Sequence, residues 1–444
     1  MRKIIYTTGV VVAMAILPSC KKYLDIVPVG KVIPTTVEDF RKELDAGYAL
    51  SDQDKGLAAY RGDEIRVNES SSGDVNQVFN SFTWDENGSS TGNTYNWRSK
   101  YQQIFYANHI IAAVPAATGG TDEEKDQLIG EAYLMRAYVH FNLVNLYGNA
   151  YNEATAATDK AVPVVTAVDV EKVSRRNTVK EVYNQVFADL DKGMSLMNVD
   201  NYPTAQSYKF SKVVGQAMAA RVYLYTHQWE KALTAAKAVM GQKNTLIDFN
   251  TSTVLPTLYN AIETIQAREL IYNTGTSRAM IVSDKLFSLY NATGDLRLQL
   301  YYGKDSKGNN IIKKISDNNS YRQSFRVGEI YLTAAEAAAQ LNQPDVARTY
   351  LNQLKQHRLT PAFFATEQAR IAALTGKDLL NEIYDERARE LAFEGHRWFD
   401  LRRTSQPELV HKLKGKIYTL KAGDPRYTIQ IPLEALANNP LLKE

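Results

Sequence analysis

A run of charged residues near the carboxyl end of the chain is the first group that could carry out chemistry. Glu386, Glu390 and Glu394 could supply the two carboxylates that an acid–base reaction such as glycoside hydrolysis requires. These residues alternate with Arg389 and Arg397 at helical spacing, however, which is the pattern of ion pairs that stabilise a helix. The pattern favours a structural role for this run.

Metal-binding and nucleophilic patterns are absent from the sequence. It has no HExxH, GxSxG, phosphate-binding loop or dinucleotide-binding GxGxxG in its usual context. Residues 305–309 resemble a calcium loop but lack its carboxylate spacing and terminal Glu, so they are predicted to form a plain turn. We therefore expect no enzyme activity, no metal site and no cofactor. Calcium binding is possible, but no other feature of the sequence supports it. The six histidines are scattered, at His109, His140, His227, His357, His396 and His411.

Aromatic and amide side chains in irregular segments form a second group, which suits sugar binding. Aromatic rings stack on the C–H-rich faces of sugars, and Asn, Asp, Gln and Arg bond to hydroxyls. Trp84 lies in a polar segment rich in Gly and Asn, so we expect it to stack on a ligand unless it covers the base of its own loop. The other expected ligand contacts are Tyr301, Tyr302, Tyr321, Asn76, Asn80, Arg98 and Asn310.

Tyr301 and Tyr302 are adjacent, just before a predicted turn. Neighbouring strand residues point to opposite faces, so one of the two should face outward. The remaining tryptophans fall on apolar helix faces and are predicted to be core residues, namely Trp97, Trp229 and Trp398.

The composition is that of an ordinary globular protein. Of its 444 residues, 44% are hydrophobic and 23% charged, and 52 Lys and Arg against 49 Asp and Glu give a net charge of +3. A nearly neutral chain has no electrostatic footprint for nucleic acid, which excludes that class of partner.

The amino terminus is a predicted targeting segment. Arg2 and Lys3 precede a short apolar run, which is typical of a signal peptide over residues 1–19. Cys20, the only cysteine, follows Ser19 at the place where a bacterial lipoprotein is acylated, for example with palmitate. Residues 20–36 are then a lipidated extended leader, and we expect a lipid tether rather than a membrane-spanning helix.

Helical patterns dominate the rest of the chain. Residues 38–50 and the stretch from Trp97 to Ile111 are predicted helices. Capping boxes at 121–124 and 178–181 open two more, the first ending at Gly148. A last helix is predicted over about 377–403, followed by an irregular tail.

Two segments repeat a helix–turn–helix pattern. Residues 216–240 and 327–354 place small residues at matching positions around turns at 227–228 and 342–344. The pattern resembles the tetratricopeptide unit. Residues 51–94 and 241–326 are predicted to be loop-rich insertions, with strand-like pieces at 270–273 and 311–314.

Several motifs resemble those of SusD/RagB outer-membrane lipoproteins. Residues 132–148 (AYLMRAYVHFNLVNLYG) are similar to the family helix RAYYYFxLVxLYG, and 386–403 (ERARELAFEGHRWFDLRR) to its signature ERxxELAFEGxRxxDLxR. Residues 20–28 resemble the mature start. Ile431-Pro432 and Asn439-Pro440 resemble the PIP…NP ending, although the usual Gln-Asn-Pro-Gly-Tyr finish is absent.

This resemblance implies a mainly α fold: tetratricopeptide-like helix pairs form a scaffold, with an irregular, loop-rich ligand face and a few short strands, over one body from 37 to 444. It also implies a protein tethered to the outer membrane, facing the exterior, that captures oligosaccharides and passes them to a SusC-like TonB-dependent β-barrel without altering them.

Three alternatives remain open at this point. The chain could bind oligopeptides, as RagB-like members do, or it could be a helical-repeat scaffold that binds only a partner protein. A lipoprotein glycoside hydrolase would need two carboxylates across a cleft, which no sequence spacing can reveal.

Overall fold

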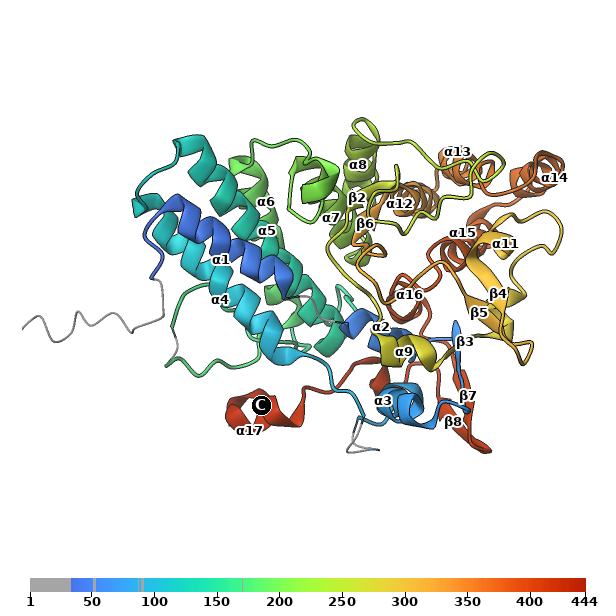
Figure 1. Cartoon of the computed structure of the whole chain (residues 1–444), viewed down its shortest axis with the longest axis horizontal. Coiled ribbons are helices and arrows are strands. Elements are labelled where there is room, and N and C mark those ends of the chain that lie inside the picture. The colour runs from blue at the N-terminus through green and yellow to red at the C-terminus, as the bar shows by residue number, and fades with distance from the viewer. Residues whose placement is uncertain (1–32, 51–52, 87, 89–91, 170) are drawn as a thin grey trace, which may run out of the picture.

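The computed structural model describes residues 33–50, 53–86, 88, 92–169 and 171–444, and its fold is mainly α-helical, as expected (Figure 1). The predicted signal peptide and Cys20 lie outside the described residues. The long helices are α1 (Val37–Ala49), α4 (Trp97–Ala113), α5 (Asp122–Tyr147), α6 (Val179–Leu196), α7 (Lys212–Tyr225), α8 (Trp229–Met240), α12 (Val327–Gln340), α13 (Pro344–Lys355), α14 (Pro361–Ala372) and α15 (Gly376–Glu390). The remaining α-helices are α2 (Asp54–Ala59), α3 (Ser72–Thr83), α9 (Thr274–Arg278), α10 (Asp284–Phe287), α11 (Arg297–Tyr301), α16 (Arg397–Thr404) and α17 (Leu433–Asn438).

The long helices pack side by side as one array. The chain passes from α1 and α4 through α5 and α6 to the pairs α7–α8 and α12–α13, and α12 then packs on α15 (Figure 1). One hydrophobic cluster runs through this array and includes the stripe Leu134, Tyr138 and Phe141 of α5. Buried apolar area is the main stabilising term for such packing.

The two predicted repeat units are helical hairpins of equal dimensions. α7 and α12 each have 14 residues, and α8 and α13 each have 12. Each hairpin turn contains a residue with left-handed backbone, His227 (φ 58°) in the first and Asn342 (φ 57°) in the second. The shared turn geometry confirms the repeat.

Local capping sets the start of two long helices. Thr121 and Thr178 each accept a hydrogen bond from the backbone N–H three residues on, and the Glu side chains at those positions bond back. Both predicted capping boxes are therefore confirmed. Such a cap contributes about 1 kcal/mol to helix stability.

The strands form four antiparallel pairs within the described residues. A second hydrophobic cluster lies among them and draws on residues 59–82, 247–302 and 388–413. The two predicted insertions thus pack against each other and against the end of the chain. The pairs are β1 (Ile65–Val67) with β3 (Met280–Val282), β2 (Thr264–Gln266) with β6 (Phe325–Arg326), β4 (Tyr302–Lys304) with β5 (Asn310–Ile312), and β7 (Leu409–Leu413) with β8 (Lys416–Leu420).

Three local predictions need correction. Residues 51–94 contain α2, β1 and α3 rather than loops alone. Residues 270–273 form no strand, because only Leu270 makes a single bridge, to Arg322. The tail after residue 405 is not irregular throughout, since its alternating apolar residues form the β7–β8 hairpin.

The last long helix is also shorter than predicted. α15 ends at Glu390, the chain turns through Phe393 (φ 61°) and Gly395 (φ 75°), and α16 begins at Arg397. The turn is held by Glu64, whose carboxylate accepts the Phe393 N–H at 3.1 Å. This long-range contact overrides the local helical pattern.

The charged run on α15 is structural, as its pattern indicated. Arg389 pairs with Glu386 inside the run at 2.8 Å, and other partners are distant in sequence. The carboxylate of Glu390 is fully buried and bonds to three arginines. They are Arg297 (3.1 Å), Arg326 (2.8 Å) and Arg358 (2.9 Å). Paired in this way, the carboxylate faces no solvent-filled cleft in which it could act on a substrate.

Candidate ligand-binding groove

A large groove lies between α4 and the C-terminal segment around α17. We call it the α4–α17 groove; its volume is about 1,330 Å³. Figure 1 shows α17 beside the start of α4, separated from the helical array. Small-molecule sites commonly occupy 300–1,000 Å³, so this groove has room for several sugar rings or a short peptide.

The α4 wall carries three aromatic side chains, Trp97, Tyr101 and Phe105. Their four-residue spacing places them on one face, about 6 Å apart along the helix axis. Trp97 is half-buried, with its ring 4.9 Å from that of Tyr101, and the Tyr101 hydroxyl donates to the Pro163 carbonyl at 2.9 Å. Phe105 is 38% exposed, so its ring is the one most available to a ligand.

The start of α4 is held rigidly from behind. Asn96 is the N-cap of α4, and its side chain accepts the Ser99 N–H at 3.0 Å. The Asp54 carboxylate accepts the Asn96 N–H at 2.9 Å and pairs with Lys100 at 3.2 Å. These bonds tie the groove wall to α2 in the body of the protein.

The opposite wall is the C-terminal segment. Leu433 at the start of α17 lines the groove and is 65% exposed. This wall is attached at both ends: the Ile429 N–H donates to the Leu146 carbonyl at 3.0 Å, and the Asn439 side chain donates to the Ser174 carbonyl at 2.8 Å. Residues separated by most of the chain therefore form one site.

Polar and charged side chains complete the lining. Glu86 is neutralised by the buried Arg61. The other charges balance, with Arg98 and Lys172 against Asp169 and Glu434. The uncharged polar residues of the lining include Asn93, Asn96, Gln102, Gln430 and Asn438. An aromatic wall with amides and no net charge suits a neutral, hydroxyl-rich ligand.

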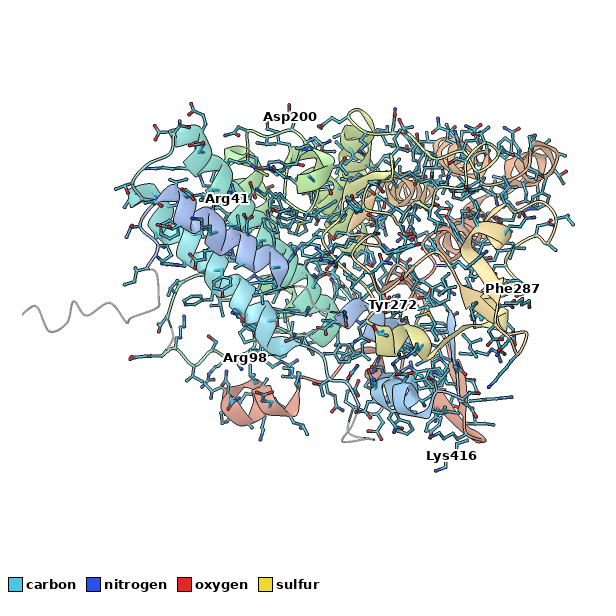
Figure 2. The ribbon with its side chains drawn as sticks, in the orientation of Figure 1. Arg41, Arg98, Asp200, Tyr272, Phe287 and Lys416 are labelled. Carbon is cyan, nitrogen blue, oxygen red and sulfur yellow. The ribbon has the colours of Figure 1, made fainter. Side chains whose placement is uncertain are left out.

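Two of the predicted ligand contacts line this groove. Arg98 is exposed at the start of α4, on the side of α17 (Figure 2). Asn80 is only 4% exposed, and its amide donates to the Glu86 carbonyl at 3.1 Å. Arg98 can therefore reach a ligand directly, whereas Asn80 positions the groove rim.

The prediction that Trp84 stacks on a ligand is wrong for this structure. Trp84 is 1% exposed and caps α3 with a left-handed backbone (φ 55°). Its indole N–H donates to the Arg61 carbonyl at 3.0 Å, and its ring stacks on His411 at 4.1 Å. The β7–β8 hairpin, which the sequence pattern did not reveal, covers the ring.

Tyr301 and Tyr302 are also buried, at 0% and 3% exposure, so the expectation that one faces outward is wrong. The alternation rule fails because Tyr301 ends α11 and only Tyr302 begins β4. The hydroxyls of Tyr302 and Tyr290 are 2.7 Å apart, and Lys314 lies 4.3 Å from the Tyr301 ring centre. Both rings belong to the second hydrophobic cluster.

The other three predicted contacts do not line the groove. Asn76 is exposed on α3, Asn310 is half-buried on β5, and Tyr321 is half-buried in the segment before β6. The structure therefore does not bring the eight predicted residues together. Sequence reasoning missed Phe105, although its spacing from Trp97 and Tyr101 on a helix that also carries Arg98 was a usable signal.

The described residues contain no group of three or more His, Cys, Asp or Glu side chains that could hold a metal ion. Residues 305–309 form the turn between β4 and β5, in which Asp305 accepts backbone N–H bonds from Lys307 and Asn309 at 2.9 and 2.8 Å. The predicted turn is confirmed. Within the described part of the chain, no helix has the length and apolarity needed to cross a membrane.

Comparison with known proteins defines the class. Residues 22–224 match a family model described as starch-binding and associating with the outer membrane, and residues 290–442 match the SusD family model. The chain belongs to the SusD/RagB family. This agrees with the motifs at 132–148 and 386–403.

The individual relatives have low sequence identity to this chain, but the similarity extends over nearly their whole length. SusD-like protein P38 of Formosa agariphila is 23% identical, over 91% of this chain and 92% of that protein. A SusD superfamily protein of Bacteroides fragilis has 22% identity and a TM-score of 0.76, covering 92% of this chain and 99% of that one. A laminarin-binding SusD-like protein has 20% identity and a TM-score of 0.63, covering 84% and 92%.

Proposed function

We propose that this chain is a binding protein that holds a neutral oligosaccharide in the α4–α17 groove. The observation that carries the proposal is the groove lining itself: Phe105 is exposed, several amide side chains lie in the same lining, and the free charges balance. A sugar ring presents C–H faces to an aromatic ring and hydroxyls to amides, so both kinds of lining residue are used. The laminarin-binding relative supports the same ligand class.

The bound oligosaccharide is passed to a SusC-like TonB-dependent β-barrel, and the chain performs no reaction on it. Acylation of Cys20 would hold the chain at the outer membrane, facing the exterior. The family model described as associating with the outer membrane supports this location. Co-purification of the barrel with the full-length chain from membranes tests the partnership, and its absence after mild cross-linking would count against it.

Calorimetric titration of residues 21–444 tests ligand binding. The panel contains neutral gluco-oligosaccharides, including laminarin and starch fragments, uronic-acid oligosaccharides and mixed peptides. Phe105→Ala should weaken sugar binding at least tenfold, about 1.4 kcal/mol. The matched control is Tyr259→Ala, because Tyr259 is 40% exposed and lies outside the groove.

The outcomes separate the alternatives. Sugar binding that Phe105→Ala weakens and Tyr259→Ala leaves unchanged supports the proposal. If only peptides bind, the ligand is an oligopeptide rather than a sugar. If no panel member binds but the chain still captures the barrel, the chain is a scaffold that binds only a partner protein. Release of new reducing ends from an oligosaccharide would show that the chain is a glycoside hydrolase.

A further inference from the structure

One buried histidine, His411 on β7, has both ring nitrogens next to backbone carbonyl oxygens. Its Nδ1 lies 2.7 Å from the Phe82 carbonyl oxygen, and its Nε2 lies 2.7 Å from the Gly62 carbonyl oxygen. A carbonyl oxygen can only accept a hydrogen bond, so each of these bonds needs a proton on the ring nitrogen. Neutral imidazole carries one such proton and imidazolium carries two. Both bonds therefore form only when His411 is charged.

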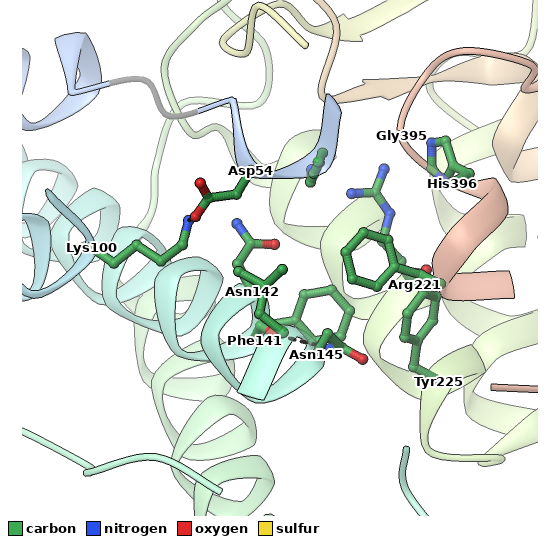
Figure 3. A pocket seen from close by; sticks show the side chains of 12 residues that line it. Asp54, Lys100, Phe141, Asn142, Asn145, Arg221, Tyr225, Gly395 and His396 are labelled. Carbon is green, nitrogen blue, oxygen red and sulfur yellow. Dashed lines mark hydrogen bonds and ion pairs between the residues drawn. The ribbon is translucent and has the colours of Figure 1, made fainter. Parts of the chain in front are cut away.

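The buried histidines His140 and His396 are placed differently. The Nδ1 of His140 lies 3.0 Å from a carbonyl oxygen of its own helix, and its Nε2 accepts a backbone N–H at 3.4 Å, so a neutral ring satisfies both contacts. His396 lines a small cavity of about 20 Å³ together with Arg221 (Figure 3). Burial and neighbouring cations hold the pKa of His396 well below its ordinary value, so its ring is neutral. Unlike these two rings, His411 faces two acceptors.

The surroundings of His411 contain features that stabilise a charged ring. The Phe82 carbonyl belongs to the last turn of α3, where carbonyls have no partner within the helix and a cation is favoured. The imidazole ring also stacks on the rings of Phe82 and Trp84, with centroid distances of 4.2 and 4.1 Å. Aromatic faces attract cations. Burial opposes the charge, since His411 is only 6% exposed.

Charged and titratable groups on two other elements also act on the ring. Arg61 and Asp63 lie between α2 and β1, and Asp63 is paired with Arg397 at 2.6 Å. Tyr418 on β8 is the cross-strand partner of His411. Burial lowers the pKa of His411 below its ordinary value of 6.5, and Arg61 adds to this shift, whereas the two carbonyl oxygens and Asp63 oppose it. The ring therefore gains its second proton only at mildly acidic pH.

His411 holds the segment that forms one rim of the α4–α17 groove. Asn80 and Ser81 line the groove just before Phe82, and Glu86 lines it shortly after. Glu86 is in turn bonded to Arg61, the neighbour of Gly62. A ring that bonds both carbonyls thus ties residues 61–62 to residues 80–86, whereas a neutral ring bonds only one of the two segments.

We propose that His411 is a positioning residue through which a proton controls the α4–α17 groove: with two ring protons it fixes the rim, and with one it releases one carbonyl. This inference rests on the proposed function, because it describes how binding at that site is regulated. Sugar should bind more tightly at about pH 5 than at about pH 8. Because such coupling is reciprocal, bound sugar should in turn favour protonation of His411.

Nitrogen NMR of residues 21–444 with labelled histidine tests the protonation step without any ligand. The two ring nitrogens of imidazolium resonate close together, whereas those of neutral imidazole are widely separated. We expect the His411 signals to change from the first pattern to the second as the pH rises from about 4.5 to about 8. Either pattern retained over the whole range would overturn the inference. The signals are assigned from their loss in His411→Phe, or in His411→Gln if the first variant does not fold.

Calorimetric titration with a sugar of the panel over the same pH range tests the link to the groove. The affinity of the unaltered chain should fall about fivefold as the pH rises. His411→Phe keeps an aromatic ring beside Trp84 but has no ring N–H, so its affinity should not vary with pH. The control His357→Gln should keep the fivefold change, because His357 contacts a single backbone carbonyl and lies outside the groove.

The two measurements separate the possible failures. An equal pH dependence in His411→Phe and in the unaltered chain would overturn the inference while leaving sugar binding in place. If no sugar binds at any pH, the proposed function and the regulation that rests on it are both wrong. The NMR titration then still shows whether the His411 ring takes up a second proton.

Discussion

Phe105 on α4 and Leu433 on α17 line the same groove from opposite walls, and both leave much of their side chains exposed, 38% and 65% respectively. Exposed apolar side chains that lie together in a groove with polar residues around it commonly mark an interaction site. A ligand that enters between them removes both from water. Binding should therefore show a negative heat-capacity change, which is the robust marker of apolar burial.

Shortening Leu433 should weaken ligand binding without affecting the fold. Because its side chain is largely exposed, Leu433→Ala should change the free energy of unfolding by less than about 0.5 kcal/mol. Oligosaccharide affinity should fall several-fold, as measured by calorimetry alongside denaturant unfolding. Unchanged affinity would mean that α17 is not a wall of the site.

The balance of charges in the groove predicts that binding depends little on salt. Since Arg98 and Lys172 are offset by Asp169 and Glu434, a neutral ligand meets no net charge. The dissociation constant should change less than about threefold between ~50 and ~500 mM salt. A tenfold or larger loss of affinity would indicate a charged ligand such as a uronic-acid oligosaccharide.

Trp84 should matter for stability. Because its side chain is 1% exposed and covered by the β7–β8 hairpin, Trp84→Ala should lower the free energy of unfolding by about 3–5 kcal/mol. Trp84→Phe should cost less, since it leaves a smaller cavity. Denaturant unfolding measures both variants, and a loss for Trp84→Ala below about 1 kcal/mol would contradict the buried position.

Glu64 should make the protein less stable as the pH rises from about 4.5 to 7. Burial raises the pKa of Glu64 from 4.5 to about 7, so in this range the folded state keeps a proton that the unfolded state has released. Its Oε1 has no hydrogen-bond partner, while Oε2 accepts the Phe393 N–H. Glu64→Gln should therefore match the parent near pH 4.5 and exceed its unfolding free energy by about 3 kcal/mol at pH 8.

The control for this experiment is Glu38→Gln on α1, since the Glu38 side chain is 78% exposed. Its stability difference from the parent should be small and nearly flat over the same pH range. A Glu64→Gln profile parallel to that of the parent would show that folding does not raise the pKa of Glu64.

Local signals predicted the scaffold well. The capping boxes at Thr121 and Thr178 and the paired hairpins α7–α8 and α12–α13 depend on residues close in sequence, so their patterns are visible in the chain itself. The break between α15 and α16 was missed because it depends on Glu64, which lies far away in the sequence and holds the Phe393 N–H.

The candidate site was harder to predict for the same reason. Arg98 was predicted only as a side chain able to bond to sugar hydroxyls, and its place in one groove with Leu433 depends on how distant parts of the chain meet. Trp84 was misassigned because the residue that covers it, His411, comes from a distant hairpin. Burial of an isolated aromatic residue cannot be deduced from its neighbours in sequence.

A crystal structure of residues 21–444 with the tightest-binding oligosaccharide of the panel tests most directly whether the α4–α17 groove binds sugar. We expect a sugar ring stacked on Phe105, with its hydroxyls bonded to groove residues such as Arg98 or Gln430. Sugar density confined to another surface, for example near Tyr321 and Asn310, with the α4–α17 groove filled only by solvent, would contradict it.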